Sequence, residues 1–432
     1  MKKKILYIHH GKGLGGAPLS LLYLIQNLDK DKFEPVVLFL HDSEAVELYR
    51  SKNINIAGIV GLNDFPHTKI YWFKFYNLVP FFRSVLDSLK TRYFVAKKWI
   101  KQINPDLVHL NTSSLIVWAK VAKNLNIPVV FHVREPLANG YLGIRKRLIT
   151  RWVERYSDAI TPICKNDAKP WFNSNKVTVI NNAVDHNKFN QDSSNQDSSN
   201  QDFSNQDFSN QDFSNQDFSN QDFSNQDFLK KYNLNIHDPK ILFLGGLSFE
   251  KGTLQILKIF EQLLGLIPDA KLIVAGYFDL SVSSVFNLKR YFPDQRYKLK
   301  VRKVLKKISK SVIFTGVIKD VENALGVCDV LAVPFLVGHF ARPIIEAGFM
   351  AKPVIASKIA PLDELMIHGQ TGYLFDLKNR AAWVEKLYAL ITNKKLNDQI
   401  GKKAYDFCIK NFNVNDHAHK FEKIYQNILN GF

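Results

Sequence analysis

The sequence predicts an α/β protein made of two Rossmann-like, doubly wound domains that face a cleft. Short β-type runs alternate with longer helical patterns along the chain, which is typical of βαβ units and parallel sheets. This alternation occurs twice, with a low-complexity break between the two series. A chain of 432 residues is also too long for one ordinary core.

The strand-type runs divide into two sets. In the first half they read KILYIHH, EPVVLFLH, NIAGIVG, DLVHLNT, PVVFHVRE, DAITPIC and KVTVINN, with helical patterns over 19–28 and 114–125. In the second half they read KILFLGG, KLIVAGY, SVIFTGV, DVLAVPF, PVIASKI and GYLFD. We therefore predict an N-terminal domain over 1–189 and a C-terminal domain over 229–413. A last helix over about 414–432 is expected to pack back on the first domain.

The break over 190–228 repeats NQDSS and then NQDFS. Such a segment cannot bury enough apolar surface to order itself, so a disordered linker between the domains is the favoured interpretation. The alternative is a pentapeptide-repeat coil with phenylalanine facing inward, although glutamine stands where that architecture prefers a small residue.

The composition restricts the function. The net charge of +18, most of it in the first domain, indicates an acidic partner. No nucleic-acid-binding module is recognisable, which leaves an anionic lipid or a phosphorylated substrate. No apolar run is long enough for a signal peptide or a membrane span. The three cysteines have no metal-ligand spacing, so we expect reduced thiols in a cytoplasmic protein and no bound metal.

Two glycine-rich turns follow strands and precede helices. The first spans residues 11–16 and includes Gly15 and Gly16; the second spans 245–252 and includes Gly245 and Lys251. Glycine lets a phosphate approach backbone N–H groups at a helix N-terminus, and a lysine there can neutralise it. A purely structural tight turn and a solvated lysine are the alternatives.

The stretch HFARPIIEAGFMAKPVIAS over 339–357 has the strongest pattern. Pro343 suits the first helical turn, so Phe340, Ala341 and Arg342 would present N–H groups and a cation to an anion. Glu346 lies one turn further and can accept two ribose hydroxyls; a glutamate that only stabilises the helix dipole is the alternative.

In the first domain His132, Arg134 and Glu135 end a strand. Ligands bind at the carboxyl ends of strands in open α/β sheets, so these side chains are expected to face the acceptor side of the cleft. For His132 a structural role is an equal alternative.

Taken together, these motifs resemble glycosyltransferase family 4, the group 1 glycosyl transferases of the GT-B fold. The resemblance covers GGAPLSLL, IPVVFHVRE, KVTVINNAVD, GGLSFEKG, VIFTGVIKDVENALGVCDVLAVPF, RPIIEAGFMAKPVIAS and HGQTGYLF, which is most of the chain outside the repeat. It implies a retaining, metal-independent transferase without a cofactor. Such an enzyme moves a sugar from a nucleotide-diphosphate sugar to a glycan or lipid-linked acceptor.

The resemblance also implies roles for particular residues. Gly16 would lie near the donor diphosphate and His132 near the sugar, with His132 and Glu346 as the catalytic pair. Lys251 and Arg342 would bind the diphosphate, Glu346 the ribose, and Gly316 and Val317 the base. Two positions depart from the family pattern: Gly338 replaces a glutamate and Gly246 replaces an arginine.

Residues 69–101 contain eight lysines and arginines and one acidic residue, interleaved with aromatic side chains. This composition suits the surface of an anionic membrane. We therefore expect peripheral contact with the inner face of the membrane, the alternative being a helix with its aromatic side chains packed inward.

Three other functions remain open from the sequence alone. A nucleotide-sugar epimerase of the same architecture would change its sugar without an acceptor. An NAD-dependent oxidoreductase would use the glycine-rich turn over 11–16. A non-catalytic protein would bind a nucleotide-sugar without turnover.

Overall fold

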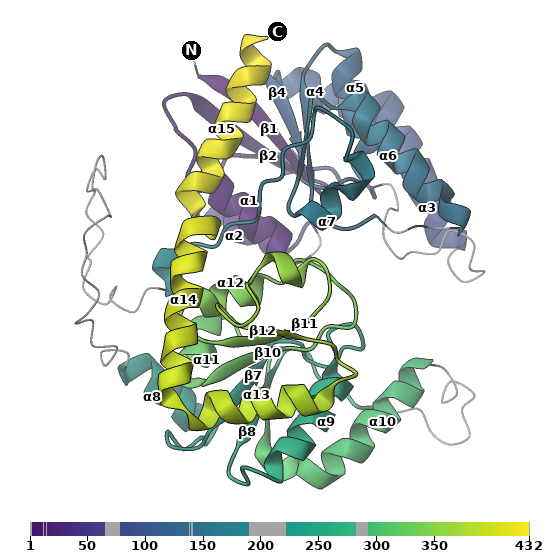
Figure 1. Cartoon of the computed structure of the whole chain (residues 1–432). Helices are drawn as coiled ribbons and strands as arrows, with labels where there is room; N and C mark the ends of the chain where they lie inside the picture. Colours follow the sequence, from purple (N-terminus) through teal and green to yellow (C-terminus); the bar gives the residue numbers. More distant parts are fainter. Residues whose placement is uncertain are drawn as a thin grey trace. The chain divides into compact units, whose positions relative to one another are not determined.

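The computed structural model of the chain describes residues 2–64 apart from Lys12 and Leu14, 78–189 apart from Ala138 and Gly140, 222–281 and 293–431. The chain forms two compact units. Unit 1 comprises Met1–Val184 and Asn411–Phe432, and unit 2 comprises Asp185–Lys410. Figure 1 shows the chain with labels on many of its helices and strands.

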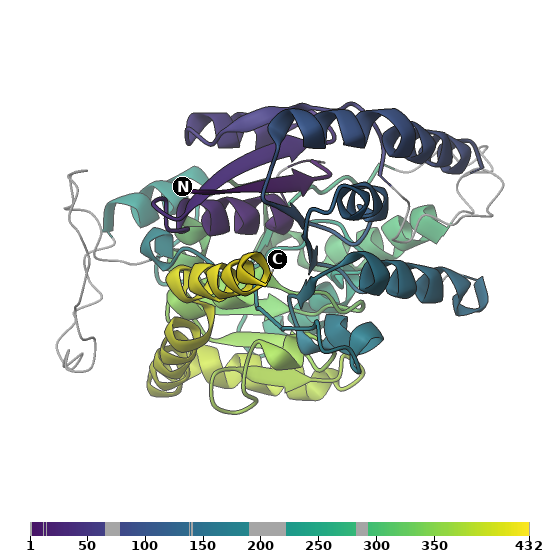
Figure 2. The ribbon, with the colours of Figure 1, turned by 90° about the horizontal axis from the view of Figure 1, so that it is seen from above.

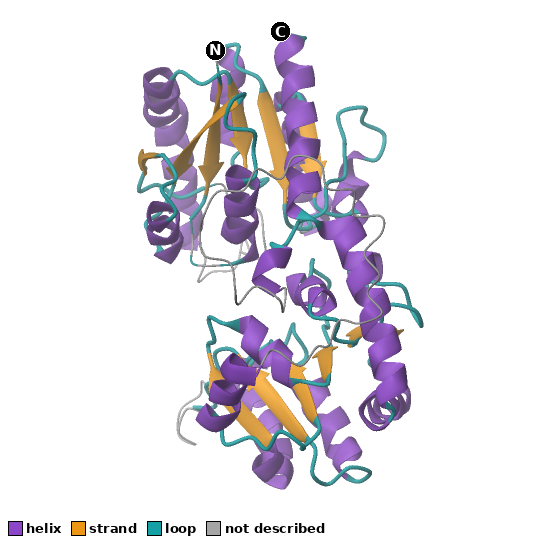
Figure 3. Ribbon diagram, turned by 90° about the vertical axis from the view of Figure 1, so that its left-hand side faces the viewer, coloured by secondary structure: helices purple, strands orange, loops and turns teal. Residues whose placement is uncertain are grey.

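Unit 1 contains a six-stranded parallel sheet in the order β3-β2-β1-β4-β5-β6, with helices on both faces (Figure 3). Its strands are β1 (Lys3–His9), β2 (Phe33–Phe39), β3 (Ile56–Ile59), β4 (Leu107–Leu110), β5 (Val129–Val133) and β6 (Ala159–Pro162). Its helices are α1 (Gly16–Gln26), α2 (Glu44–Ser51), α3 (Leu78–Lys90), α4 (Ala96–Ile103), α5 (Ile116–Asn124), α6 (Ile144–Tyr156), α7 (Lys165–Ala168) and α15 (Val414–Asn430).

The prediction of a seventh strand in unit 1 is wrong. The run KVTVINN alternates apolar and polar residues as a strand does, but Val177 makes only an isolated bridge to Ile160. The segment follows β6 at the edge of the sheet through three backbone hydrogen bonds and forms no ladder.

The C-terminal helix α15 packs on one face of the sheet of unit 1. Alternate side chains of β1 point to opposite faces, and Ile5 and Tyr7 share a buried cluster with Phe421 and Tyr425 of α15. The hydroxyls of Tyr7 and Tyr425 are 3.2 Å apart. The other face of β1 packs against α4, α5 and α6.

Helices α3 and α4 are joined through a π-helical turn, Thr91–Val95, so that residues 78–103 form one helical run, which can be followed in Figure 2. Ala96, Ile100 and Trp99 pack against the core of unit 1. This face anchors the C-terminal part of the run, while Phe82, Leu86, Leu89, Tyr93 and Phe94 are exposed.

Unit 2 repeats the architecture with the order β12-β11-β10-β7-β8-β9, again parallel. Its strands are β7 (Lys240–Phe243), β8 (Lys271–Ala275), β9 (Val312–Gly316), β10 (Val330–Val333), β11 (Val354–Ser357) and β12 (Tyr373–Phe375). Its helices are α8 (Asp222–Lys231), α9 (Thr253–Leu264), α10 (Pro293–Ile308), α11 (Val321–Val327), α12 (Arg342–Phe349), α13 (Arg380–Thr392) and most of α14 (Lys394–Phe412). The two sheets confirm the prediction of two Rossmann-like, doubly wound domains.

The repeat lies mostly outside the described residues, which resume at 222. Its last residues belong to α8, where Phe228 and Leu229 are buried and the Phe228 ring packs 4.7 Å from that of Tyr232. Helix α8 contacts α11. Unit 2 therefore includes the end of the segment that the sequence assigned to a linker.

The strand order places a topological switch point in each sheet. In unit 1 the order reverses between β1 and β4, and in unit 2 between β7 and β10. Ligands of open α/β sheets bind outside the carboxyl ends of the strands at such points. The loops that follow these four strands are therefore the places to look for a site.

Candidate functional site

The glycine-rich turn after β1 leaves the N-terminus of α1 open. Gly15 caps α1 with φ −100°, and no side chain caps this helix end. A Cβ built on Gly15 or Gly16 would have no described atom within 4 Å. Packing against the described residues does not require glycine at either position, so the space beside these N–H groups is available to an anion.

Arg134 is buried at the end of β5 and donates hydrogen bonds to three groups. Its guanidinium contacts Asn111 Oδ1 at 2.5 Å, Asn182 Oδ1 at 2.7 Å and His132 Nδ1 at 3.3 Å. Burial lowers the pKa of Arg134 to about 10, so the side chain stays charged at neutral pH. The arginine that the sequence assigned to the acceptor side is thus engaged inside unit 1.

His132 is fully buried beside Arg134. Burial, and then the charge of Arg134, hold its pKa well below the ordinary value. The imidazole is therefore neutral at pH 7. Its Nδ1 atom lies between Arg134 and His109, whereas its Nε2 atom has no hydrogen-bond partner among the described residues.

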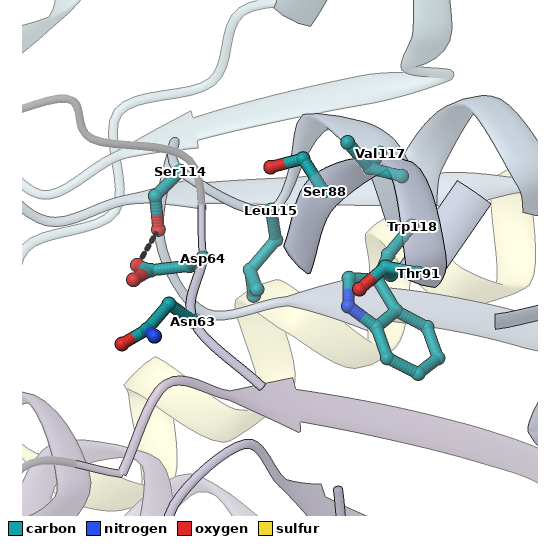
Figure 4. Close-up of a pocket in the computed structure, with 8 residues that line it drawn as sticks. All are labelled: Asn63, Asp64, Ser88, Thr91, Ser114, Leu115, Val117 and Trp118. Atoms are coloured by element: carbon teal, nitrogen blue, oxygen red, sulfur yellow. Dashed lines mark hydrogen bonds between the residues drawn. The ribbon is translucent and has the colours of Figure 1, made fainter. Parts of the chain in front are cut away.

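Glu135 accepts hydrogen bonds from the hydroxyls of Thr112 at 2.6 Å and Ser113 at 3.1 Å, both in the loop after β4. The next residue, Ser114, donates to Asp64, which follows β3 (Figure 4). Figure 4 shows the small pocket beside this bond, which has a volume of about 10 Å³, enough for one water molecule. Sequence reasoning missed Asp64, although a polar pair after a strand was the available signal.

Lys251 is a half-buried cation in the glycine-rich turn after β7. Its ammonium has no hydrogen bond or ion pair with another described residue, and burial lowers its pKa. The carbonyl of Glu250 accepts hydrogen bonds from the backbone of Leu336 at 2.8 Å and Val337 at 3.3 Å. These bonds hold the turn against the segment that leads from β10 to α12.

Arg342 and Glu346 form an ion pair at the start of α12. Arg342 Nε lies 2.7 Å from Glu346 Oε1, one helical turn apart, and the Glu346 side chain is buried. Burial raises the pKa of Glu346 and Arg342 opposes this rise. No side chain caps the N-terminus of α12, and Pro343 occupies its first turn as expected.

At the two positions that depart from the family pattern, Gly338 and Gly246, nearby backbone atoms leave no room for a side chain. A Cβ on Gly338 would lie 1.8 Å from the carbonyl oxygen of Ala360, and one on Gly246 would lie 2.4 Å from that of Tyr277. Gly246 also has φ +55°, a conformation that side chains other than glycine rarely adopt. Neither a glutamate at 338 nor an arginine at 246 fits this backbone.

Four exposed apolar side chains lie in the loops that follow β7, β8, β9 and β10, which are neighbours in the sheet. They are Phe249, Tyr277, Val317 and Leu336. Gly316 ends β9 with φ +71° and open space around its Cα. Of these four residues, only Val317 was predicted from the sequence as a site residue. The other three were missed because, in the sequence, an aromatic residue or a leucine after a strand looks the same as a residue of the hydrophobic core.

The predicted site residues fall into two groups, one in each unit. The carboxyl end of the sheet in unit 1 carries Gly15, Gly16, His132, Arg134 and Glu135, and that of unit 2 carries Gly245, Lys251, Gly316, Val317, Phe340, Ala341, Arg342 and Glu346. Among the described residues, no three His, Cys, Asp or Glu side chains are arranged to hold a metal ion. No helix in the described part of the chain is long and apolar enough to cross a membrane.

Comparison with known families accounts for both units. The profile of Glycosyltransferase Family 4 matches residues 14–188, and the profile of Glycosyl transferases group 1 matches residues 224–407. A similar protein is the lipopolysaccharide 1,2-N-acetylglucosaminetransferase of Salmonella typhimurium, 28% identical over 43% of this chain and 48% of that protein. The chain thus spans about half of the length of this curated relative. A second similar protein is the N-acetyl-alpha-D-glucosaminyl L-malate synthase of Bacillus anthracis, which is 23% identical over 28% of this chain. That match covers 32% of the synthase.

Solved structures show the same fold. Anabaena Alr3699/HepE in complex with UDP superposes with a TM-score of 0.73 at 17% identity, covering 98% of this chain and 100% of that one. The apo lipopolysaccharide outer core galactosyltransferase WaaB gives 0.63 at 15% identity, with 98% and 99% covered. The two doubly wound units are therefore those of the GT-B fold.

Proposed function

This chain belongs to glycosyltransferase family 4, and we propose that it moves a sugar from a nucleotide-diphosphate sugar to an acceptor hydroxyl. One observation carries the proposal: in unit 2 the half-buried Lys251 has no partner among the described residues, and the turn that carries it is held against the segment that leads to Arg342 and Glu346. A buried cation without a counter-ion costs free energy unless an anion joins it. The UDP and UDP-glucose complexes of the similar HepE structures support a donor of this kind.

Each part of the donor then has a place in unit 2. The diphosphate binds Lys251, Arg342 and the N-terminus of α12, which no side chain caps. The ribose hydroxyls bind Glu346, and the base lies against Gly316, Val317 and the other exposed apolar side chains at these strand ends. In the free protein the guanidinium of Arg342 pairs with the carboxylate of Glu346. The bound diphosphate then contacts the same guanidinium as Glu346.

We propose retention of the anomeric configuration without a metal ion. Lys251, Arg342 and the helix N-termini stabilise the departing diphosphate, whose oxygen takes the proton of the acceptor hydroxyl. His132 contacts the donor sugar, and Glu135 with its neighbouring hydroxyls lies on the acceptor side. The acceptor is a glycan or a lipid-linked sugar.

Calorimetry with a nucleoside diphosphate tests the donor site. Lys251→Ala and Arg342→Ala should each weaken binding by about 1.5–3 kcal/mol, the range for a hydrogen bond to a charged group. Lys303→Ala, which removes an exposed lysine of α10, is the matched control and should change nothing. Unchanged affinity in both site variants would remove these residues from the site.

Product analysis tests the reaction. A panel of nucleotide-sugars is incubated with glycan acceptors and with lipid-linked acceptors, in buffer with and without a chelator, and the anomeric configuration of the product is read by NMR. Transfer with retention in both buffers is expected. A sugar altered without any acceptor would indicate an epimerase, absorbance changes with NAD(H) an oxidoreductase, and binding without turnover a non-catalytic protein.

The helical run 78–103 supports contact with a membrane surface. Phe82, Leu86, Leu89 and Tyr93 recur at helical spacing and are 60%, 59%, 44% and 59% exposed, and Phe94 beside them is 74% exposed. The exposed charges of residues 82–101 are all basic: Arg83, Lys90, Arg92, Lys97, Lys98 and Lys101. An apolar stripe flanked by cations fits the interface of an anionic bilayer. We propose that unit 1 binds the membrane here and meets a lipid-linked acceptor.

Co-sedimentation with vesicles tests this contact. Wild-type protein should bind anionic vesicles more than neutral ones, and added salt should release it. Replacing Phe82, Leu86 and Phe94 by serine should abolish binding, whereas Phe172→Ser, at a phenylalanine of unit 1 that is 86% exposed outside the stripe, should not. Equal binding by the two variants would refute the assignment of this surface.

A further inference from the structure

The hydrogen bonds of Arg134 set the direction of every bond around it. A guanidinium only donates, so His132 Nδ1 must accept from Arg134. An imidazole nitrogen that accepts carries no proton. Neutral His132 therefore has its proton on Nε2.

The bond from the other side agrees with this assignment. His109 Nε2 lies 3.2 Å from the same Nδ1 atom of His132. That atom carries no proton, so its one lone pair is shared between Arg134 and His109, and His109 Nε2 donates. The proton of His109 is then on Nε2, so its Nδ1 accepts from the hydroxyl of Tyr425 at 2.7 Å. That hydroxyl in turn accepts from Tyr7 at 3.2 Å. The bonds run in one direction, from β1 through α15 and β4 to β5.

The opposite direction loses hydrogen bonds. If Tyr425 accepted from His109 Nδ1, neutral His109 would have no proton on Nε2. That atom would then either face the lone pair of His132 Nδ1 without a hydrogen bond or need a proton from His132 Nδ1. That proton would face the guanidinium of Arg134, placing two donors against each other. Burial and the charge of Arg134 hold the pKa values of His109 and His132 well below the ordinary value, so neither ring carries a second proton at pH 7.

We propose that Arg134, His109 and Tyr425 are positioning residues that hold His132 as the neutral tautomer protonated on Nε2, so that His132 meets a ligand oxygen as a hydrogen-bond donor and not as a base. Its Nε2 atom is buried and has no partner in the described part of the chain. An unpaired buried donor is costly, which favours an occupant with an acceptor oxygen. This proposal rests on the proposed function only for the identity of that occupant, a hydroxyl of the donor sugar.

The same arginine provides an internal control at His9. Arg134 Nε requires Asn111 to present Oδ1, so the Nδ2 group of Asn111 faces His9 and donates to its Nδ1 at 3.0 Å. His9 is therefore also protonated on Nε2, but it does not contact His109 or Tyr425 by any hydrogen bond in the described residues. Changes in Tyr425 should leave His9 unaffected.

The tautomers can be measured without substrate. In protein labelled with ¹⁵N-histidine, two-bond ¹H–¹⁵N NMR spectra distinguish the two nitrogens of each ring, and the loss of one signal in His132→Gln assigns His132. At pH 7 the free wild-type protein should show His132, His109 and His9 protonated on Nε2 alone. A proton on Nδ1 of His132, or a doubly protonated ring, would overturn the proposal.

Tyr425→Phe tests the relay. Removing its hydroxyl leaves His109 Nδ1 without a donor, so the His109 and His132 signals should shift while the His9 signals stay in place. Tyr49→Phe is the matched control, since this buried hydroxyl donates to Pro18 O and lies outside the relay. Unchanged His109 and His132 signals in Tyr425→Phe would remove Tyr425 from the relay.

Turnover tests the role as a donor. The amide of His132→Gln can donate a hydrogen bond but cannot act as a base, whereas His132→Leu can do neither. Loss of one positioned donor lowers kcat on the order of a hundredfold, so Leu should lower kcat by about that factor and Gln by at least tenfold less, with nucleoside-diphosphate affinity equal in both. Equal loss in the two variants would show that a hydrogen-bond donor at this position is not sufficient and would overturn the role as a donor. Because the NMR measurement needs no substrate, a failure of the proposed function would leave the tautomer result standing.

Discussion

The two units have the same topology but opposite chemistry at their strand ends. Unit 1 buries four histidines and an arginine there, and the polar contacts of Arg134 are made by the unit itself. Unit 2 keeps the ammonium of Lys251 without a partner among the described residues and pairs Arg342 with Glu346. One sheet thus ends in neutral histidines around a charged arginine that bonds within its own unit, and the other in two cations, of which one pairs with a glutamate.

The glycine-rich turns after β1 in unit 1 and after β7 in unit 2 also differ in what surrounds their glycines. Gly15 and Gly16 of unit 1 have open space where a side chain would be, whereas Gly245, Gly246 and Gly252 of unit 2 lie against their own protein atoms. In unit 2 these glycines are needed to fold the turn, as Gly11 is in unit 1, whereas Gly15 and Gly16 have no described atom where a side chain would lie. Four predictions break or sharpen this contrast, and they are ordered by expected effect.

Acid should destabilise unit 1 before unit 2. Burial lowers the pKa values of His9, His109, His132 and His417, that of His417 to about 3. The unfolded chain binds protons below its ordinary histidine pKa of about 6.5 while the folded unit does not, so stability falls as the pH drops below that value. One pH unit below it costs on the order of 1 kcal/mol per histidine, so the four together cost several kcal/mol.

Hydrogen exchange followed by mass spectrometry between pH 7 and pH 5.5 resolves the two units. Peptides of β1, β4, β5 and α15 should lose protection first. None of the described histidines of unit 2 is buried, so peptides of β7 and β10 serve as the internal reference. Parallel loss in both units would contradict the prediction.

Arg134→Met should destabilise unit 1 by about 3–5 kcal/mol, the cost of breaking a buried charged network. The substitution leaves Asn111, Asn182 and His132 without their donor. Arg342→Met is the matched change in unit 2 and should cost less, about 1–3 kcal/mol, because Glu346 already has a raised pKa and can take up a proton. Urea unfolding of the two variants measures the difference, and equal costs would remove the contrast between the units.

The sequence predicted the sheets because their strands are buried on both faces and so read as continuous apolar runs. It also selected Lys251, Arg342 and Glu346 as candidate donor-binding residues of unit 2, since they lie within one or two turns of helix starts that proline and glycine mark; their contact with a donor stays a prediction. KVTVINN was mistaken for a strand because strand propensity does not reveal whether a partner continues beside it.

The buried network of unit 1 was beyond the sequence. His109 and Tyr425 are 316 residues apart and meet only because α15 returns to the first sheet. Asn111 and Asn182 likewise approach Arg134 through the fold and not through any local spacing. A pattern of residues along the chain predicts a helix end, but it does not predict which polar groups the tertiary structure will bury together.

Gly338→Ala should destabilise unit 2 by about 1–3 kcal/mol, the usual cost of overpacking, because its Cβ would overlap the carbonyl of Ala360. Gly316→Ala is the control. Its Cβ would meet no described atom within 4 Å, so only the strain of φ +71° remains, about 1 kcal/mol. If Gly316→Ala lowers the thermal midpoint more than Gly338→Ala does, the backbone around residue 338 can shift to accept a side chain at little cost. The position could then take the family's glutamate.

Gly16→Ala should have the smallest effect on stability, within about 0.5 kcal/mol. Its Cβ would meet no described atom within 4 Å, and alanine is the better helix former at the first residue of α1. Affinity for the nucleotide-sugar should nevertheless fall about tenfold, or about 1.4 kcal/mol, because the methyl group would occupy the space that a diphosphate needs to reach the N–H groups of α1.

Gly246→Ala in unit 2 should show the reverse pattern. Its φ of +55° and its approach to the carbonyl of Tyr277 make alanine strained, so thermal stability should fall. Calorimetry and thermal unfolding of the two variants side by side separate a glycine that serves a ligand from one that serves the fold. If Gly16→Ala changes neither stability nor donor affinity, the first turn is only a structural bend, and the donor contacts of this protein are confined to unit 2.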